Sequence, residues 1–291
     1  MIDRVRSFSK SLYSLLRIPS LIVVVLAYLA IAKIVERPGD ALRDICMLLA
    51  LYGGMYSFND FIDVEADSIN NPQRPIPAAR LSRVAGLFIA VFLYSCGLML
   101  ALTSAWTKAV FATVFIFTSA MYSICIKSVP IVKNVAAALL VSSVVGYATE
   151  VAHGQPAGWV VFGASLLLNI GREILMDLRD RDGDASVGIV TLATLSRPAT
   201  TIAIAGIFTL FGLGVVVGSS FAHTNWAFPA PPAFSVFVTL LWLTGVFFIS
   251  RTSASSARPI RRVISFYKLY FAFMLLSVIA VGTISTLSGK P

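Results

Sequence analysis

Charge is scarce in this 291-residue chain, because only 13% of its residues are Asp, Glu, Lys or Arg, half of the roughly 25% in an average soluble domain. Apolar residues make up 57% of the chain, and its mean hydropathy is +0.85. These values exclude a soluble enzyme, a disordered chain and a small secreted domain held by disulfides. They favour a protein built from many membrane-spanning segments.

Cysteine and histidine are also rare. The three cysteines, Cys46, Cys96 and Cys125, are odd in number and lie in or near apolar runs. This predicts buried thiols and no disulfide. The only histidines, His153 and His223, fall in predicted connections, so we expect no histidine-ligated transition metal.

Long apolar runs are abundant. A helix that crosses ~30 Å of hydrocarbon needs ~20 mostly apolar residues. Nine stretches are candidates: 18–35, 41–58, 84–104, 108–126, 131–149, 157–172, 199–221, 232–250 and 263–287. Backbone groups in lipid must satisfy their own hydrogen bonds, and the runs do not alternate in polarity, so we expect helices rather than a barrel. The sequence therefore predicts an all-α, polytopic membrane protein of about nine transmembrane helices, with a single domain over residues 1–291.

Positive residues are unevenly divided between the two predicted sides. Seventeen Lys and Arg fall on the side of the N-terminus and five on the other. Because these residues accumulate in cytoplasmic segments, we expect a multi-pass protein of the cytoplasmic membrane, with its N-terminus inside and its C-terminus outside. The basic segment 1–17 is expected to lie on the anionic inner leaflet. Topology and membrane lipids thus account for the net charge of +9, and no nucleic-acid partner is expected.

Acidic residues gather in two clusters, of which the first is Asn59–Asp67, NDFIDVEAD. No helix breaker occurs before Asn70, so the helix of the second span is expected to continue through the cluster. On that helix Asn59, Asp63 and Asp67 recur every four residues. Asp60 lies three residues before Asp63, so all four side chains share one stripe.

The second cluster, Glu173–Asp184, holds five acids and follows the sixth span. Asp177, Asp180 and Asp184 repeat at i, i+3 and i+7, which places them on one helical stripe. Gly183 predicts a point where the helix loosens. Both clusters lie on the predicted cytoplasmic side.

Both stripes require a counter-ion, because neighbouring carboxylates on a helix repel one another. Oxygen-only clusters suit hard divalent cations, and Mg²⁺ binds through one or two carboxylates together with substrate phosphate oxygens. Two facing stripes would hold a diphosphate between them through bridging Mg²⁺ ions. The alternative is a pair of solvated acidic helix ends without a ligand.

Basic residues on the same side are candidates for binding the diphosphate. Arg74 lies in the proline-rich turn Asn71–Pro77, and its forked donors suit a phosphate. Lys127 ends the fourth span and Lys133 follows; for a lysine at this position, a snorkelling anchor is the alternative. Three further arginines flank or interrupt the second stripe, where they relieve carboxylate repulsion: Arg172, Arg179 and Arg181.

In this arrangement the residues resemble the UbiA superfamily of intramembrane prenyltransferases. The first cluster has the family's NDxxDxxxD pattern at 59–67, followed by N-x-x-R-P-x-P at 71–77. The second has its DxxDxxxD pattern at 177–184, followed by G-x-x-T-L at 188–192. Tyr122 begins a stretch like the family's YS-x-x-x-K, which ends at Lys127. The resemblance covers nearly the whole chain.

The resemblance implies a helical bundle around a central cavity, and transfer of a prenyl chain from an isoprenyl diphosphate to an aromatic or lipid-like acceptor. It implies that one Mg²⁺ is held by Asn59, Asp63 and Asp67. A second Mg²⁺ is held by Asp180 and Asp184, with Asp60 and Asp177 in support. The implied catalytic residues are Asp63, Asp67, Asp180 and Asp184. The implied diphosphate-binding residues are Arg74, Tyr122, Lys127 and Lys133.

The acceptor and the reaction type leave alternatives open. The segment DSINNPQRPIP is less like the 4-hydroxybenzoate transferases than like the branch that acts on geranylgeranylglyceryl phosphate. A terpene cyclase of the same superfamily, which needs no acceptor, has similar metal motifs. An ion-coupled secondary transporter also ends short spans with acids, although its acids should lie near the bilayer midplane.

Overall fold

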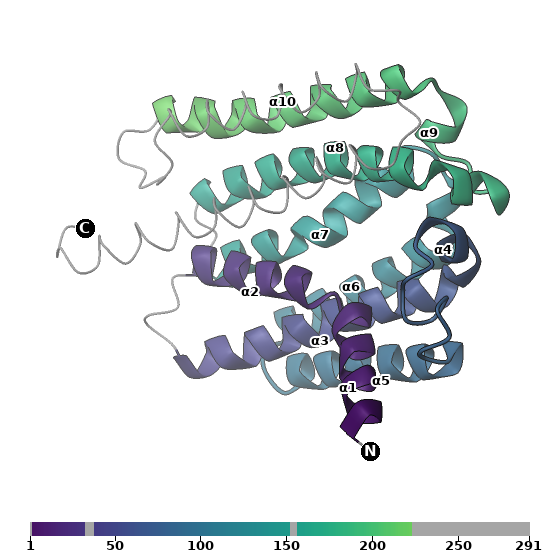
Figure 1. Ribbon diagram of the computed structural model, residues 1–291. Coiled ribbons are helices and arrows are strands. Elements are labelled where there is room, and N and C mark those ends of the chain that lie inside the picture. The colour runs from purple at the N-terminus through teal and green to yellow at the C-terminus, as the bar shows by residue number, and fades with distance from the viewer. Residues whose placement is uncertain (1, 33–37, 152–155, 223–291) are drawn as a thin grey trace. The chain divides into compact units, whose positions relative to one another are not determined.

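The computed structural model describes residues 2–32, 38–151 and 156–222, and every regular element in these ranges is a helix (Figure 1). The elements are α1 (Ile2–Leu15), α2 (Ile18–Ala32), α3 (Pro38–Ile62), α4 (Val64–Asn70), α5 (Arg83–Leu102), α6 (Trp106–Ile124), the 3₁₀ turn η2 (Ile126–Ser128), α7 (Val132–Val151), α8 (Pro156–Ser186), α9 (Leu192–Leu195) and α10 (Pro198–Ala222). The predicted all-α class is confirmed.

The predicted spans agree with the helices wherever they can be compared. Six helices are long and apolar enough to cross a membrane, namely α3, α5, α6, α7, α8 and α10, and the bent pair of α1 and α2 provides a seventh candidate. The spans at 232–250 and 263–287, as well as both histidines, lie outside the described residues, so the total of nine helices stays a prediction. The 31 residues of α8 make it about 46 Å long, which exceeds the ~30 Å hydrocarbon core by about three turns.

The chain forms two compact units by its internal contacts. Of the described residues, the first contains 2–25, 38–136 and 182–190, and the second contains 26–32, 137–151, 156–181 and 191–222. In the first unit α3 packs against both α5 and α6, and the three helices lie side by side in Figure 1. Small residues make this packing close: a Cβ at Gly54 would overlap the Tyr94 ring, and one at Gly97 would come within 2.9 Å of Leu51 Cδ2.

The same unit anchors the end of α1. Leu15, with no exposed surface, packs with Ile76 and Leu81 in a small apolar core. The chain then bends by 52° into α2, and Arg17 at the bend has a φ of +50°, which is uncommon for a residue with a side chain. The proline-rich turn 71–81 and the start of α2 are thereby fixed beside one another.

Polar side chains join the helices of the second unit. Ser142 of α7 and Ser165 of α8 lie 3.0 Å apart between hydroxyl oxygens, and Asn169 donates to the Ser142 hydroxyl at 3.1 Å. At Gly171 of α8, a side chain would overlap Thr209 of α10. Buried hydrogen bonds and close backbone approach are the usual means by which helices associate in lipid.

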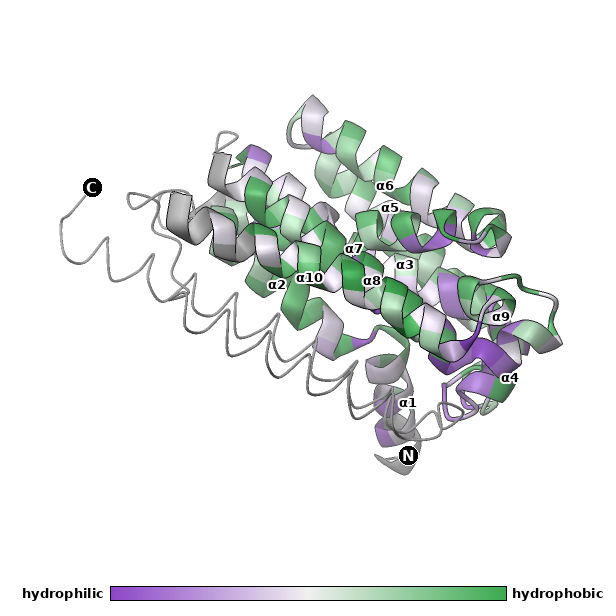
Figure 2. Cartoon of the chain, turned by 90° about the horizontal axis from the view of Figure 1, so that it is seen from above, coloured by the Kyte–Doolittle hydropathy of each residue, from purple (hydrophilic) through white to green (hydrophobic). Residues whose placement is uncertain are grey.

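Apolar side chains also cover the outer faces of several helices. Figure 2 shows α5 and α6 hydrophobic along most of their length, whereas α4 is strongly hydrophilic. Phe88 and Phe92 of α5 and Phe117 of α6 are exposed, as expected for residues that face lipid. The prediction of free cysteines is confirmed, but that of buried thiols is wrong for Cys46 and Cys125, which are exposed. A bilayer solvates a small apolar thiol as well as a protein core does.

Candidate functional site

The first acidic motif lies across the junction of α3 and α4. The predicted continuous helix is interrupted at one residue, because α3 ends at Ile62 and Asp63 is the N-cap of α4. The helical path is nevertheless retained, since the Asp63 N–H donates to the Asn59 carbonyl and the Asp67 N–H donates to the Asp63 carbonyl. Asn59, Asp63 and Asp67 therefore keep their helical relation to one another despite the interruption.

Burial confirms that these carboxylates share one face. Asp60, Asp63 and Asp67 are buried, with 2%, 7% and 5% of their surfaces exposed. Asn59 is half-buried, while Glu65, in the same cluster but off the stripe, is exposed. Buried carboxylates are expensive unless cations or strong donors compensate them.

Arg17 is one of the compensating cations, a role that the sequence analysis did not predict. Its Nη2 donates to Asp60 Oδ1 at 2.7 Å and to Asn59 Oδ1 at 3.2 Å. Its guanidinium also lies over the Tyr56 ring, 4.9 Å from the centroid, in cation–π geometry. From sequence Arg17 counted only toward membrane topology, because a sequence separation of 42 from Asn59 carries no spacing signal.

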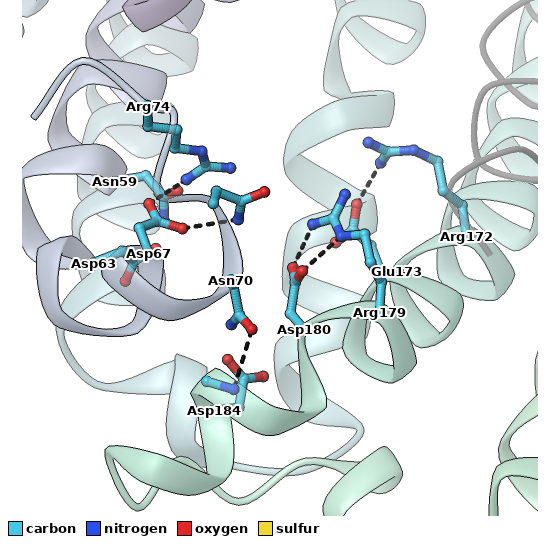
Figure 3. A network of polar contacts seen from close by, with 12 residues as sticks. Asn59, Asp63, Asp67, Asn70, Arg74, Arg172, Glu173, Arg179, Asp180 and Asp184 are labelled. Atoms are coloured by element: carbon cyan, nitrogen blue, oxygen red, sulfur yellow. Dashed lines mark hydrogen bonds and ion pairs between the residues drawn. The ribbon is translucent and has the colours of Figure 1, made fainter. Parts of the chain in front are cut away.

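Arg74 of the proline-rich turn is a second compensating cation, and its predicted role in binding the diphosphate stays a prediction. It forms an ion pair with Asp67 (Figure 3). Its Nη1 also lies 3.2 Å from Asp60 Oδ1. Asn71 donates to Asp67 at 3.1 Å. Burial raises the pKa of the Asp67 carboxyl above its ordinary value, an effect that the Arg74 guanidinium opposes and that the carboxylates of Asp60 and Asp63 reinforce. A divalent cation would stabilise the ionised form of this carboxyl.

The predicted lysines lie in the same compact unit. Lys127, in η2, forms an ion pair with Asp63, and Tyr122 lies half-buried in the last turn of α6, just before it. Lys133, at the start of α7, is buried, with its Nζ 3.9 Å from Asp184 Oδ2. Both lysines thus lie next to carboxylates of the two acidic motifs.

The second acidic motif lies on one uninterrupted helix. Since α8 runs from Pro156 to Ser186, Asp177, Asp180 and Asp184 share one of its faces. Asp177 and Asp184 are buried, and Asp180 forms a two-bond ion pair with Arg179, with Nε 2.6 Å from Oδ1. Asp182, off the stripe, is exposed.

The prediction that Gly183 loosens the helix is wrong. Gly183 is helical, and its N–H donates to Asn70 Oδ1 at 3.1 Å. A side chain at this position would overlap the Asn70 amide, so the glycine permits α8 to approach α4. Figure 3 shows Asn70 reaching the α8 backbone beside Asp184. This contact brings the end of the second motif to the helix that carries the first.

Gly188 ends α8 in a defined way. Its φ of +73° suits glycine. The N–H of Ile189 donates to the Asp184 carbonyl and that of Gly188 donates to the Ala185 carbonyl, which is the Schellman pattern. The first residue of the G-x-x-T-L element thus fixes the helix end just after Asp184.

The residues present fit a divalent cation by their chemistry. The donors are carboxylate and amide oxygens, which hard cations prefer. Within the described ranges, no three acidic, imidazole or thiol groups already converge on one point. Instead Asp63, Asp67 and Asp180 are each paired with a basic side chain. A bound Mg²⁺ would replace these basic groups as the partner of the carboxylates.

Comparison with known proteins identifies the family of the chain. Residues 20–283 match the UbiA prenyltransferase family. Digeranylgeranylglyceryl phosphate synthase of Pyrococcus horikoshii is 35% identical over 168 residues, which are 56% of this chain and 60% of that protein. The synthase of Methanoculleus marisnigri is 30% identical over 208 residues, 70% of this chain and 72% of that protein. The aligned part thus spans about three fifths of the Pyrococcus horikoshii protein.

Solved structures share the fold. A UbiA homolog from Archaeoglobus fulgidus bound to GPP and Mg²⁺ superposes with a TM-score of 0.70 at 14% identity, covering 93% of this chain and 99% of that one. An apo UbiA homolog from Aeropyrum pernix gives the same TM-score and identity, covering 92% and 98%. The apolar helices and the family match over residues 20–283 together show an integral membrane protein that belongs to the UbiA prenyltransferase family.

Proposed function

We propose that this chain, as one domain, transfers a prenyl group from an isoprenyl diphosphate to a lipid-like acceptor in the membrane, in an Mg²⁺-dependent reaction. One observation carries the proposal. Within a single compact unit, four buried carboxylates of the two motifs lie among three cations that suit phosphate oxygens. The carboxylates are Asp60, Asp63, Asp67 and Asp184, and the cations are Arg74, Lys127 and Lys133.

The metal residues in this proposal are those of the two stripes. Asn59, Asp63 and Asp67 would hold one Mg²⁺, Asp180 and Asp184 a second, with Asp60 and Asp177 in support. When bound, Mg²⁺ supplies charge stabilisation for the diphosphate leaving group. Arg74, Lys127 and Lys133, with Tyr122, would then donate to the diphosphate oxygens, since their present carboxylate partners would bind the metal instead.

The reaction balances as a substitution at the allylic carbon. The bond between C1 of the prenyl chain and the diphosphate oxygen breaks, and its electron pair leaves with the diphosphate. A lone pair of the acceptor oxygen forms the new bond to C1, and the acceptor proton is released. Cations fixed around the leaving group stabilise the charge that develops on it. The lipid acceptor is favoured over an aromatic one because the relatives named above are digeranylgeranylglyceryl phosphate synthases.

Product analysis tests this function. Purified protein in lipid nanodiscs is incubated with C10, C15 or C20 diphosphates, with and without geranylgeranylglyceryl phosphate or 4-hydroxybenzoate, and the products are identified by mass spectrometry. We expect a prenylated ether lipid that disappears with EDTA. A cyclic product formed without acceptor would identify a terpene cyclase. Ion-coupled flux in proteoliposomes without turnover would identify a transporter, and either result would contradict the proposal.

Matched carboxylate variants test the site. Asp63→Asn and Asp180→Asn should each lower turnover at least a hundredfold, because each removes a charge from the proposed metal stripes. Glu65→Gln and Asp182→Asn lie in the same clusters but are exposed, so they should stay within about threefold of the unmodified protein. Equal effects in the two pairs would refute the assignment of the stripes.

A further inference from the structure

We infer that Arg172 and Arg179 of α8 bind the phosphate of a phosphorylated lipid acceptor. This inference rests on the proposed function and names the acceptor class more closely. The reaction brings two anionic groups together, a diphosphate donor and a phosphomonoester acceptor. Arg74 and Lys127 pair with the first motif and suit the diphosphate, whereas Arg172 and Arg179 have no part in the mechanism so far.

The two arginines form a repeat along α8. Arg172 pairs with Glu173, and seven residues later Arg179 pairs with Asp180. Seven residues make nearly two helical turns, so both arginines lie within ~20° of each other around the axis and about 10 Å apart along it. Long side chains at this spacing can reach one phosphate from two sides.

The ion pairs of Arg172 with Glu173 and of Arg179 with Asp180 each join two neighbouring residues. Neighbouring residues on a helix point about 100° apart and do not face each other, so each arginine must turn sideways to reach its carboxylate. The Arg179 fork contacts both oxygens of Asp180, and the same forked donors suit two oxygens of a phosphate. A metal at Asp180 would also release Arg179 for such a ligand.

The depth of the two arginines points to a lipid phosphate. Arg172 lies 16 residues after the start of α8, about 24 Å along the axis, and Arg179 lies about 34 Å along it. If α8 enters the ~30 Å hydrocarbon at its first turn, the two residues lie on either side of the far boundary. Both side chains are largely buried, with 18% and 13% exposed. Lipid phosphates lie at this boundary, while the prenyl chains extend into the hydrocarbon.

Equilibrium binding in the presence of EDTA tests the inference without the metal or turnover. The probes are geranylgeranylglyceryl phosphate, its dephosphorylated form, and glycerol phosphate. Each charged hydrogen bond is worth about 1.5–3 kcal/mol, so Arg172→Gln and Arg179→Gln should each raise the Kd of the phosphorylated lipid about tenfold to a hundredfold. Binding of the dephosphorylated lipid should be weak and unchanged by the variants. Glycerol phosphate binding as tightly as the lipid would overturn the lipid assignment.

Two further variants separate binding from structure. Arg181→Gln removes a charge from the same turn of α8, but about 160° around the axis from Arg179, and should leave the Kd within twofold. Glu173→Gln removes the competitor of Arg172 and should lower the Kd several-fold, a gain that a purely structural ion pair does not predict. If Arg181→Gln matches Arg172→Gln, or if Glu173→Gln weakens binding, the inference is wrong.

Kinetics distinguish this inference from the proposed function. The KM for the phosphorylated acceptor should rise at least tenfold in Arg172→Gln, while the KM for the prenyl diphosphate changes less than threefold. Parallel rises in both KM values would contradict a separate acceptor site. If the unmodified protein forms no prenylated product from any acceptor, the proposed function itself fails.

Discussion

The carboxylates of the first motif are neutralised one by one by named cations. Asp60 accepts from Arg17 and Arg74, and Asp63 is paired with Lys127. Such pairing explains how an acidic row can be buried in a chain so poor in charge, because unpaired carboxylates would neutralise by taking up protons. Each cation also has the donors that a diphosphate needs. The same residues thus serve the folded apoprotein and, in our proposal, the bound substrate.

Loss of Arg17 should weaken the binding of Mg²⁺. Its guanidinium fixes Asn59 and Asp60, and loss of a group that orients metal ligands commonly costs 10–100-fold in metal affinity. Arg17→Gln should therefore raise the Mg²⁺ concentration at half-maximal turnover about tenfold or more, with a smaller change in the KM for acceptor. Turnover measured against Mg²⁺ concentration checks this, with the exposed Arg6 as control in Arg6→Gln. An unchanged Mg²⁺ dependence would mean that Arg17 has only a structural role.

At the scale of elements, close contacts between helices position the motifs. Gly97 of α5 allows α3 to approach, and the first motif begins in the last turn of α3. Gly183 permits the contact between α8 and α4, and Gly188 ends α8 directly after the second motif. Each of these three glycines therefore permits a close approach or a helix end next to one of the motifs.

The contact between α4 and α8 gives a second prediction. Gly183→Ala places a methyl group against the Asn70 amide, and overpacking typically costs about 1–3 kcal/mol. The thermal midpoint should fall and turnover should drop. Asn70→Ala removes the obstacle, so the double variant should be more stable than Gly183→Ala alone. Thermal unfolding in detergent measures this non-additivity. Strictly additive effects would show that the two residues do not interact.

At the scale of the whole molecule, orientation in the membrane is still a prediction. The excess of positive residues on one side predicts that the acidic motifs face the cytoplasm. The turn 71–82 and the connection after α5 provide exposed positions for a test, Gln73 and Ser104. These two belong to opposite sides in the predicted topology.

Cysteine labelling measures the orientation directly. In a background with the three native cysteines replaced, Gln73→Cys and Ser104→Cys are treated with a membrane-impermeant maleimide in right-side-out vesicles. We expect labelling at 104 in intact vesicles and at 73 only after permeabilisation. The reverse pattern would show that the acidic motifs lie on the extracytoplasmic side, so the topology predicted from the positive residues would be wrong.

Much of the fold and the site could be predicted from sequence, for definite physical reasons. Seven apolar runs predicted helices correctly, because a helix is the only single-segment structure that satisfies its backbone in lipid. The spacing of Asp60, Asp63 and Asp67 predicted a shared face, since helical periodicity is a local property. The position of Arg74 in a turn beside the first motif could be predicted because prolines mark that turn.

The remainder depended on contacts between distant segments. Arg17 reaches Asn59 across 42 residues, and Asn70 reaches Gly183 across 113. Neither contact leaves a spacing pattern in a single sequence. Gly183 illustrates the problem: a glycine within a helix ordinarily suggests weakness, but here it permits close approach of a second helix. The exposed Cys46 and Cys125 were misjudged because lipid, unlike water, accepts apolar side chains.

The sequence separation of 113 between Asn70 and Gly183 also means that the two motifs are synthesised at different times. At roughly 5–20 residues per second, a ribosome needs about 6–23 s to pass from one to the other. Throughout that interval the first motif is already made, while α8 (Pro156–Ser186) is still absent or incomplete. Arg17 precedes the motif and Arg74 follows it closely, so the cations that pair with Asp60 and Asp67 are synthesised with it. The nascent chain can therefore neutralise its acidic row before the helix that completes the site has left the ribosome.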